Sequence, residues 1–391
     1  MNDRDRQNAT LNFEKGIDRG AVLETFYPWN NTIDNWRKEG LPLAIAESSY
    51  VKNPIDNNRE EQYLYCALTD GVYDYEQYLG FDGVKRVMLL PPFSGFNEMI
   101  IEENDEFMIK QESDGWHRKY YKNINRMEEI KPVVQDENDW YKLKEKAYEE
   151  ISKHYTDKNI QNIYGKYSEG HQRGDYTIRL NINGFFWTPR TLFGIEKHLY
   201  AFYDYPAVMH DINMFMLEFY YDKLGKVLDI LPADVVYICE DLSGKTGPMI
   251  SGSHFDEFVG HYYSEIVPFL KSKGVGNVLV DTDGDFSRLI PNFIKTGIDG
   301  FLPMDVNAGM DIVKVRNEFP MVKFIGAYNK LALEKDRFAI DAEFERLMPV
   351  IRQGGFIPGN DHQVTPDTPF ENYKYYIGRL REVMEEAYRK Y

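Results

Sequence analysis

Cysteine is scarce in this sequence: only Cys66 and Cys239 occur among 391 residues. Two cysteines cannot build a disulfide framework or a cysteine-rich zinc module, and such low usage is typical of proteins from a reducing compartment. A chain of this length buries roughly three-quarters of its unfolded surface on folding, so it needs no such cross-links. We therefore expect a cytoplasmic protein that is held together by its hydrophobic core.

The chain also lacks clustered basic residues and long apolar runs. It carries 46 Lys and Arg against 63 Asp and Glu, a formal net charge of −17, whereas binding to nucleic-acid phosphates needs clustered cations. No apolar run approaches the roughly 18 residues that cross a bilayer, and the polar start MNDRDRQNAT does not have the form of a signal peptide. These absences predict neither a nucleic-acid partner nor membrane insertion.

From about residue 176 onward, apolar segments with a strand pattern alternate with helical stretches. The strand-like segments are 176–183, 234–239, 276–280, 300–303, 322–325 and 355–357. Nearly continuous apolar strands that alternate with helices are typical of a parallel sheet covered on both faces. With one or two earlier strands, of which 87–90 is a candidate, they predict a (β/α)8 TIM barrel. A doubly wound open sheet is the competing fold, but no Gly-rich dinucleotide fingerprint follows any of the strands.

The residues before this region predict extensions of the barrel. Residues 1–75 are expected to form an irregular N-terminal arm of short helices and loops, because proline and asparagine interrupt regular structure there. A β-hairpin insertion is expected within 100–125, since alternating residues flank the turn Asp114-Gly115. We interpret residues 1–391 as one barrel domain with an arm and a hairpin.

In a TIM barrel the functional residues lie in the turns that follow the strands, at their carboxyl ends. Acidic groups are more frequent in these turns than turn formation requires. The turns read Asn183-Gly184-Phe185-Phe186-Trp187, Cys239-Glu240-Asp241, Asp281-Thr282-Asp283-Gly284-Asp285, Met304-Asp305, Tyr328-Asn329-Lys330 and Asn360-Asp361-His362. We expect the side chains of Glu240, Asp281, Asp283, Asp305 and His362 to converge around one cavity.

Asp281 and Asp283 stand two residues apart at a strand end, so their side chains point to the same side. Two carboxylates in an enclosed mouth repel each other unless they share a cation, accept hydrogen bonds or keep a proton. With His362 as a third ligand they would form a set of two oxygens and one nitrogen that suits zinc, manganese or a similar divalent ion. Two other interpretations stay open: a metal-free polar site and a helix cap.

Glu240, Asp241 and Lys245 form a second candidate cluster after another strand. Glu240 or Asp241 could act as a general acid or base whose pKa is tuned by burial, and Lys245 could orient an anionic group. The alternative is an ion pair that only fixes the loop. Asp305, which follows a third strand, is a further candidate for a catalytic or ligand role.

Four more residues are candidates for substrate binding: Trp187, Arg190, Tyr328 and Lys330. Trp187 can form the floor of a pocket, and Arg190 can pair with a carboxylate or phosphate. The alternative for these two is a tryptophan of the core and an arginine of the rim. Tyr328 and Lys330 flank Asn329 in another of the rim turns.

Three segments resemble the uroporphyrinogen decarboxylase superfamily. They are Phe186-Trp187-Thr188-Pro189-Arg190, residues 240–251 and residues 365–372. Over the best-matched part, roughly 175–391, the sequence is more similar to the cobalamin-linked methyltransferase branch than to the decarboxylases. The resemblance implies a (β/α)8 barrel that transfers a methyl group from a small methylated substrate, with a thiol or a corrinoid carried by a partner protein as acceptor.

The sequence also departs from these relatives. The decarboxylases carry an N-terminal Arg-Gln-x-Gly-Arg segment, and residues 1–60 contain none, which argues against porphyrinogen decarboxylation. The methyltransferase branch binds zinc through a His-x-Cys pair and a distal Cys, whose places are taken here by Asp281, Asp283 and His362. Two other functions therefore stay open: a decarboxylase or lyase acting on a small carboxylate, and a ligand-binding barrel without catalysis.

Overall fold

The computed structural model describes residues 1–49, 70–93, 96–124 and 126–388. Cys66 and residues 50–69 of the expected N-terminal arm lie outside these residues. The N-terminal helices are α1 (Asp3–Leu11), α2 (Asn30–Lys38), α3 (Leu43–Ser49) and α5 (Asp70–Leu79).

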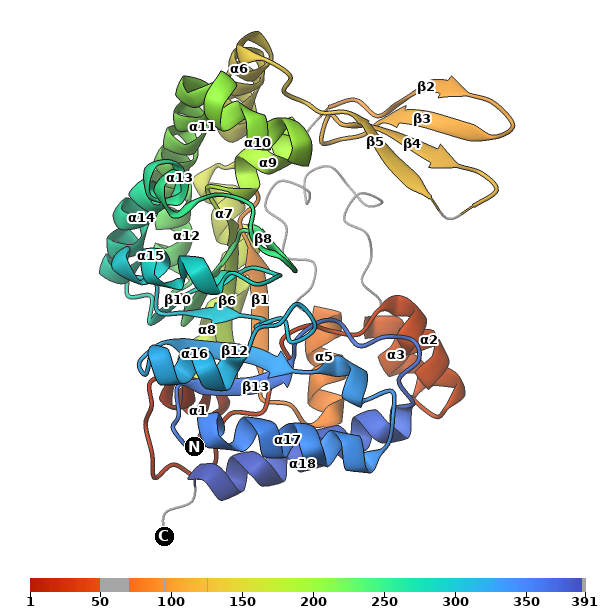
Figure 1. Cartoon of the computed structure of the whole chain (residues 1–391), viewed down its shortest axis with the longest axis vertical. Coiled ribbons are helices and arrows are strands. Elements are labelled where there is room, and N and C mark those ends of the chain that lie inside the picture. Colours follow the sequence, from red (N-terminus) through yellow and green to blue (C-terminus); the bar gives the residue numbers. More distant parts are fainter. Residues whose placement is uncertain (50–69, 94–95, 125, 389–391) are drawn as a thin grey trace.

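A curled parallel sheet of seven strands forms the centre of the molecule (Figure 1). The order of the strands follows the chain: β1 (Val84–Met88), β6 (Thr177–Asn183), β7 (Val235–Cys239), β10 (Asn277–Asp281), β11 (Gly300–Leu302), β12 (Lys323–Tyr328) and β13 (Phe356–Asn360). Helices lie between consecutive strands and cover the outer face of the sheet. This arrangement confirms the predicted TIM-barrel-like fold, and β1 overlaps the candidate strand at 87–90.

The helices on the outside of the sheet are mostly short. They are α6 (Glu137–His154), α7 (Asp157–Tyr164), α8 (Ser168–Arg173), α9 (Trp187–Phe193), α10 (Ile195–Asp204), α11 (Pro206–Phe219), α12 (Gly225–Ile230), α13 (Gly252–Phe255), α14 (His261–Ser272), α15 (Ile290–Lys295), α16 (Ile312–Glu318), α17 (Arg337–Ile351) and α18 (Phe370–Tyr388). Within the described part of the chain, none of the helices combines the length and the hydropathy that crossing a membrane requires.

An extended segment of the N-terminal arm stands where an eighth strand would close the barrel. Among the described residues, no strand pairs with the free edges of β1 and β13. Residues 20–25 bridge the two edges instead. The Val22 carbonyl accepts a hydrogen bond of 2.8 Å from the Asp82 amide just before β1, and the Glu24 carboxylate accepts one of 2.7 Å from the Asn360 amide of β13. The arm is therefore part of the barrel wall.

Helix α1 closes the amino-terminal end of the barrel. The Gln7 side chain donates to the Gly83 carbonyl at 2.8 Å, and Leu11 packs against inward-facing apolar side chains of the strands, such as Leu279 and Ile325. Apolar residues fill this end of the barrel as a closed core. Helix α1 thus covers the amino-terminal end, where a small cavity of about 20 Å3 remains beside Arg86 and Arg179, and a larger space of about 400 Å3 lies towards the carboxyl ends of the strands.

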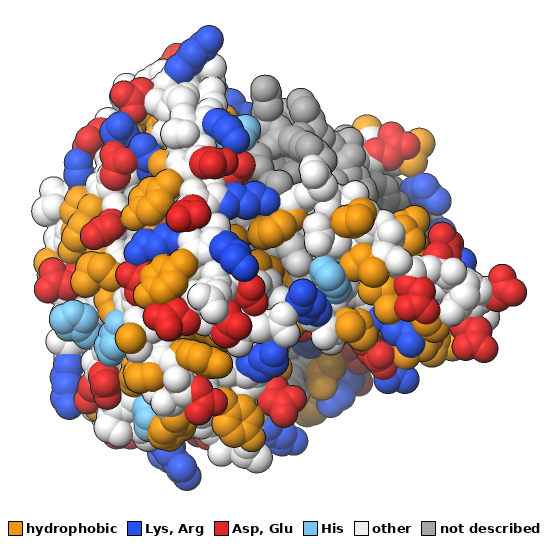
Figure 2. All heavy atoms as spheres, turned by 90° about the horizontal axis from the view of Figure 1, so that it is seen from above, with side chains coloured by type: hydrophobic (Ala, Val, Ile, Leu, Met, Phe, Trp, Pro, Cys, Tyr) orange, Lys and Arg blue, Asp and Glu red, His pale blue; other side chains and the backbone are white. Residues whose placement is uncertain are grey.

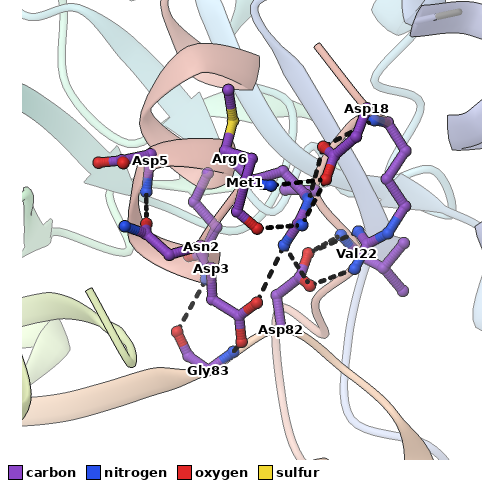
Figure 3. A network of polar contacts seen from close by, with 12 residues as sticks. Met1, Asn2, Asp3, Asp5, Arg6, Asp18, Val22, Asp82 and Gly83 are labelled. Carbon is purple, nitrogen blue, oxygen red and sulfur yellow. Dashed lines mark hydrogen bonds and ion pairs between the residues drawn. The ribbon is translucent and has the colours of Figure 1, made fainter. Parts of the chain in front are cut away.

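A network of charged groups fastens α1 to the barrel (Figure 3). Arg6 donates to Asp3 at 2.9 Å, to Asp18 at 2.8 Å and to Asp82 at 3.2 Å. Asp82 is almost completely buried and also accepts hydrogen bonds from Arg19 and from the Val22 amide. Asp82 therefore ties α1 and the extended arm segment to the start of β1.

Replacing Asp82 by alanine is expected to destabilise the protein by about 3–5 kcal/mol, because it leaves buried arginine charge without a partner. Urea denaturation followed by circular dichroism measures this loss. Asp5→Ala, at an exposed position on the same helix, is the matched control and should change the free energy of unfolding by less than about 0.5 kcal/mol. Equal stabilities of the two variants would show that this network does not hold the arm in place.

A four-stranded antiparallel sheet stands out from the barrel beside α9 and α10 (Figure 1). Its strands are β2 (Met99–Glu103), β3 (Phe107–Gln111), β4 (His117–Tyr121) and β5 (Met127–Lys131). Strands β3 and β4 form the predicted hairpin, and Gly115 supplies the positive φ of 84° that its turn needs. The expected hairpin is thus the centre of a larger sheet. On the face of the whole molecule that Figure 2 shows, acidic, basic and apolar side chains are intermixed.

Candidate functional site

The carboxyl ends of four neighbouring strands form the floor of a cavity. Side chains alternate between the two faces of a strand, and the last inward residues of β1, β6, β7 and β10 are Met88, Asn183, Cys239 and Asp281. All four line a cavity of about 400 Å3, which we call the mouth cavity. It lies at the end of the barrel where the sequence predicted a site.

Loops after the strands form the walls of the mouth cavity. Trp187, Asp241, Asp283 and His362 come from four different loops and line it together. The N-terminal arm adds Phe26, whose ring stacks on the His362 imidazole with the ring centroids 6.2 Å apart. The structure therefore brings together residues that are up to 336 positions apart in the sequence, 26 to 362.

Carboxylates dominate the electrostatics of this cavity. Asp241, Asp281 and Asp283 line it, and among the described residues no lysine or arginine side chain does. Burial, reinforced by Asp283 and opposed by the nearby Arg179, raises the pKa of Asp281 to about 7. Burial and the charge of Asp283 also raise the pKa of Asp241. A cation that entered the cavity would relieve this repulsion.

Asp283 and His362 meet across the mouth. The His362 Nε2 lies 3.3 Å from the Asp283 Oδ1. Burial lowers the pKa of His362, but the hydrogen bond to Asp283 and the charges of Asp283, Asp361 and Asp305 outweigh burial and raise it overall. The acidic groups around the imidazole therefore favour its protonated, positively charged form.

A group that could hold a metal ion lies next to this pair. Ligand atoms of Asp305, Asp361 and His362 all lie within 4.8 Å of one another. Asp361 is fully buried, and its oxygens accept hydrogen bonds from the backbone amides of Lys330 at 3.1 Å and Val306 at 3.2 Å, which fix the carboxylate. Two carboxylates and one imidazole form a donor set that suits zinc or manganese.

This group differs from the set that the sequence predicted, Asp281, Asp283 and His362. Of the described residues, only Asp305, Asp361 and His362 meet the geometric condition for a shared ion, so His362 is common to both sets. Asp361 directly follows β13 and neighbours His362 in the chain, whereas Asp281 ends β10. Asp283 also follows β10 but reaches the His362 imidazole at 3.3 Å, so it contacts the group without belonging to it.

Glu240, a predicted acid–base residue, does not line the mouth cavity. Its buried carboxylate accepts hydrogen bonds of 2.8–3.0 Å from the backbone amides of Phe185, Phe186 and Trp187, and one of 2.6 Å from the Tyr263 hydroxyl. Burial raises the pKa of Glu240 to about 7, against these four donors, which lower it. The geometry makes Glu240 a support for the loop that carries Trp187.

Asp241, Trp187 and Arg190 form one connected unit beside the cavity. The Asp241 backbone has a positive φ of 44°, and its carbonyl accepts a hydrogen bond of 2.5 Å from Arg190. The Arg190 guanidinium lies 5.0 Å from the centre of the Trp187 ring. Trp187 reaches the mouth cavity, while the Arg190 side chain lines a neighbouring cavity.

Three other residues that the sequence predicted to bind substrate lie away from the mouth cavity. Tyr328 is fully buried on the outer face of β12, and its hydroxyl donates to the Ile340 carbonyl at 3.1 Å. Gly326 and Ala327 have positive φ values of 106° and 61°, which interrupt the alternation along this strand, and the Tyr328 ring packs against Phe344 and Tyr376 outside the barrel. Lys245 is exposed in the turn between the short strands β8 (Ser243–Gly244) and β9 (Gly247–Pro248). Lys330 contacts Asp361 through its backbone amide.

Several residues of the cavity were not predicted. Alternation along β6 and β7 could have identified Asn183 and Cys239, since both occupy the last inward position of a strand. Burial raises the pKa of the Cys239 thiol well above its usual value, which favours the uncharged form. Phe26 had no sequence signal, because an irregular arm has no periodicity from which its position could be inferred.

The chain matches known proteins at the level of family and fold. The family model described as uroporphyrinogen decarboxylase (URO-D) matches residues 179–383. A methyltransferase from Methanosarcina mazei has a similar structure, with a TM-score of 0.61, 14% sequence identity and coverage of 98% of this chain and 99% of that chain. This likeness concerns the fold alone.

A proposed vitamin B12-independent methionine synthase from Listeria monocytogenes gives a TM-score of 0.33 at 12% identity, over 95% of this chain and 97% of that chain. This score is too low to support an argument about fold or function. No curated protein matches the chain.

Proposed function

The chain belongs to the uroporphyrinogen decarboxylase family, and we propose that it is an enzyme that transfers a methyl group from a small methylated substrate. The acceptor would be a thiol or a corrinoid carried by a partner protein. One fold supports many chemistries, so this proposal depends on the site and not on the family alone. The observation that carries it is the charge of the mouth cavity.

Three carboxylates line the mouth cavity: Asp241, Asp281 and Asp283, and no lysine or arginine side chain of the described residues joins them. A carboxylate substrate would face like charges, each worth about 4 kcal/mol at 4 Å and an effective dielectric of 20 when the carboxylate is ionised, against one positive group of the lining, His362. This repulsion disfavours the alternative of a decarboxylase or lyase acting on a small carboxylate. It favours a methyl group attached to a positively charged nitrogen or sulfur, an onium group.

The rings of the cavity support the same substrate class. Trp187 and Phe26 both line it, and the face of an aromatic ring attracts a cation, tryptophan most strongly. A methylated onium group has a diffuse positive charge and an apolar surface, so it interacts favourably with both the rings and the carboxylates. The mouth cavity is therefore suited to an onium head group.

In the proposed reaction, the bond between the methyl carbon and the onium heteroatom breaks, and its electron pair stays on the heteroatom. The methyl carbon forms its new bond with an electron pair of the acceptor, a thiolate or a reduced corrinoid. The heteroatom loses its positive charge in this step. The carboxylates therefore bind the substrate more strongly than the neutral product, and they act in binding and orientation.

A divalent ion, zinc or manganese, fits the group Asp305, Asp361 and His362 by its donor atoms and by their 4.8 Å separation. When bound, it would supply Lewis acidity for a thiol acceptor, whose deprotonation a divalent ion favours. The backbone amides of Lys330 and Val306 hold Asp361 for this role. Asp283, which pairs with His362, would orient the imidazole.

Elemental analysis of purified variants tests this ligand set. Asp305→Asn and His362→Ala are each expected to lower the bound metal at least about 10-fold, the scale of losing a coordinating or orienting group. Asp281→Asn is the matched control and should retain the metal, because it lies outside the group. Metal loss in Asp281→Asn with retention in Asp305→Asn would contradict the assignment.

An activity assay tests the proposed function itself. The full-length protein is incubated with methylated onium compounds and, separately, with small carboxylates, in the presence of a thiol or of reduced cobalamin. We expect a methylated acceptor from an onium donor and no carbon dioxide from the carboxylates. Release of carbon dioxide would favour the decarboxylase alternative, and tight onium binding without any product across the panel would favour a binding protein without catalysis.

A further inference from the structure

A second cavity, of about 480 Å3, lies between the four-stranded sheet and the barrel. Asp114, Trp116 and Arg118 line it from the side of the sheet. Helices α9 and α10 line it from the side of the barrel. It shares Asn183 and Trp187 with the mouth cavity, so the two cavities meet at these residues. We call this space the side cavity.

The wall of the side cavity is largely apolar. Six apolar residues contribute to it: Leu90, Pro91, Phe93, Val133, Leu192 and Ile195. The charged groups on the wall are two acidic and two basic residues, so their charges balance. Arg118 lies 2.8 Å from Asp114 and 3.6 Å from Glu129, and Arg190 donates a hydrogen bond to the Asp241 backbone carbonyl. The side cavity therefore offers little net charge to a ligand, in contrast to the mouth cavity.

Two tryptophans in this wall are fastened to the chain around them. The Trp116 ring is held through its Nε1, which donates to the Thr191 carbonyl at 2.8 Å. Trp187 is anchored by its backbone amide, which donates to Glu240 at 2.8 Å, and the Arg190 guanidinium lies 5.0 Å from the centre of its ring. Trp116 approaches the chain so closely that a Cβ at Gly194 would lie 2.9 Å from its ring, and Gly194 also has a positive φ of 77°. Flat, rigid ring surfaces of this kind stack on planar groups at a low entropic cost.

We propose that the side cavity binds the body of the substrate, a planar apolar group such as an aromatic ring, while the methylated head group occupies the mouth cavity. Asn183 and Trp187 form the boundary across which the two parts of the substrate are joined. The nature of the head group rests on the proposed function, whereas binding of a ring in the side cavity is measured without any methyl transfer.

Calorimetry with three probes tests this division. Tetramethylammonium carries the head alone, benzyl alcohol the ring alone, and benzyltrimethylammonium both. We expect benzyltrimethylammonium to bind the full-length protein at least about 30-fold more tightly than tetramethylammonium, since a buried ring adds a large apolar contact. Equal affinities of these two cations would overturn the proposal.

Variants that fill the side cavity locate the ring. Ile195→Trp changes a side chain that lines this cavity but is 44% exposed, so a larger ring is accommodated without repacking the core. It should remove the advantage of benzyltrimethylammonium and leave the affinity for tetramethylammonium unchanged. Val133→Trp, in another wall of the cavity, should do the same. Met321→Trp is the control, at a position that is 72% exposed and lines neither cavity, and it should change neither affinity.

The outcomes separate this inference from the proposed function. If Ile195→Trp and Val133→Trp reduce the affinities for tetramethylammonium and benzyltrimethylammonium equally, the placement of the ring is wrong. If benzyl alcohol binds the wild-type protein and both variants abolish this binding, the assignment of the ring to the side cavity is supported. If tetramethylammonium then fails to bind the wild-type protein, the onium head group and the proposed function are rejected, but the binding of a ring in the side cavity is not.

Discussion

Asp281→Asn is expected to make the ligand-free protein more stable at pH 8 and, at the same time, to lower methyl-transfer activity by roughly 100-fold, the scale of losing one buried charge contact. The side chain ends β10 inside the mouth cavity, where it faces Asp241 and Asp283. A group held in an unfavourable environment at a binding site often improves function at the expense of stability. Asparagine has nearly the same shape and carries no charge.

The sign of the pH dependence follows from the pKa of Asp281, which burial raises from 3.8 to about 7 in the folded protein. A raised carboxyl pKa means that the folded state binds more protons than the unfolded state, so stability falls as the pH rises from about 4 to about 7. The asparagine variant lacks this titration. Its gain in stability should therefore increase by about 2 kcal/mol between pH 5.5 and pH 8.

Thermal unfolding of both proteins at pH 5.5 and pH 8 measures this difference. Asp285→Asn is a matched control in the same loop, because Asp285 caps the Ser287 amide outside the mouth cavity, and asparagine caps a helix equally well. The control should change neither stability nor activity appreciably. A loss of stability in Asp281→Asn at pH 8, or a gain that is the same at both pH values, would contradict the electrostatic account of the cavity.

Glu240→Ala is expected to lower the free energy of unfolding by about 3–5 kcal/mol, because it leaves several buried donors without an acceptor. These donors are three consecutive backbone amides at the start of α9 and the Tyr263 hydroxyl. Tyr263→Phe removes only one of the four hydrogen bonds and should cost about 1 kcal/mol. Urea denaturation of the two variants gives both values.

This result also separates two roles of Glu240. A support of the Trp187 loop predicts that Glu240→Ala loses stability and substrate affinity together, since Trp187 lines both cavities. A general acid or base, which the sequence suggested, predicts unchanged stability with a lower kcat. Wild-type stability of Glu240→Ala would restore the acid–base hypothesis.

The sequence predicted the end of the barrel at which the site lies, because apolar strands and polar turns follow each other with a clear rhythm. Asp281, Asp283 and His362 were correctly expected to lie near one another for this reason. The metal set Asp281, Asp283 and His362 stays a prediction, and the structure adds a second candidate group that the sequence analysis did not name. Asp361 and His362 are consecutive residues after β13, and the fold brings Asp305, which follows β11, to the same point.

Other features depend on contacts that have no local signal. Tyr328 stands in a rim turn by sequence, but positive φ values at Gly326 and Ala327 interrupt the alternation of β12, and Tyr328 packs in the core. Residues 20–25 complete the barrel wall without forming a regular strand. The side cavity arises from the contact of Trp116 with Thr191, residues that are 75 positions apart. Such long-range packing determines the shape of a site and cannot be inferred from any single segment of the sequence.

The most direct test of the acidic mouth cavity compares choline with 3,3-dimethyl-1-butanol, which has the same shape but carbon in place of the charged nitrogen. Calorimetric titration of the full-length protein with each compound isolates the contribution of the charge. We expect choline to bind at least about 10-fold more tightly, a difference of about 1.4 kcal/mol, and Asp281→Asn to reduce this preference. Equal affinities, or tighter binding of the uncharged compound, would contradict the account of a cavity built for a methylated cation.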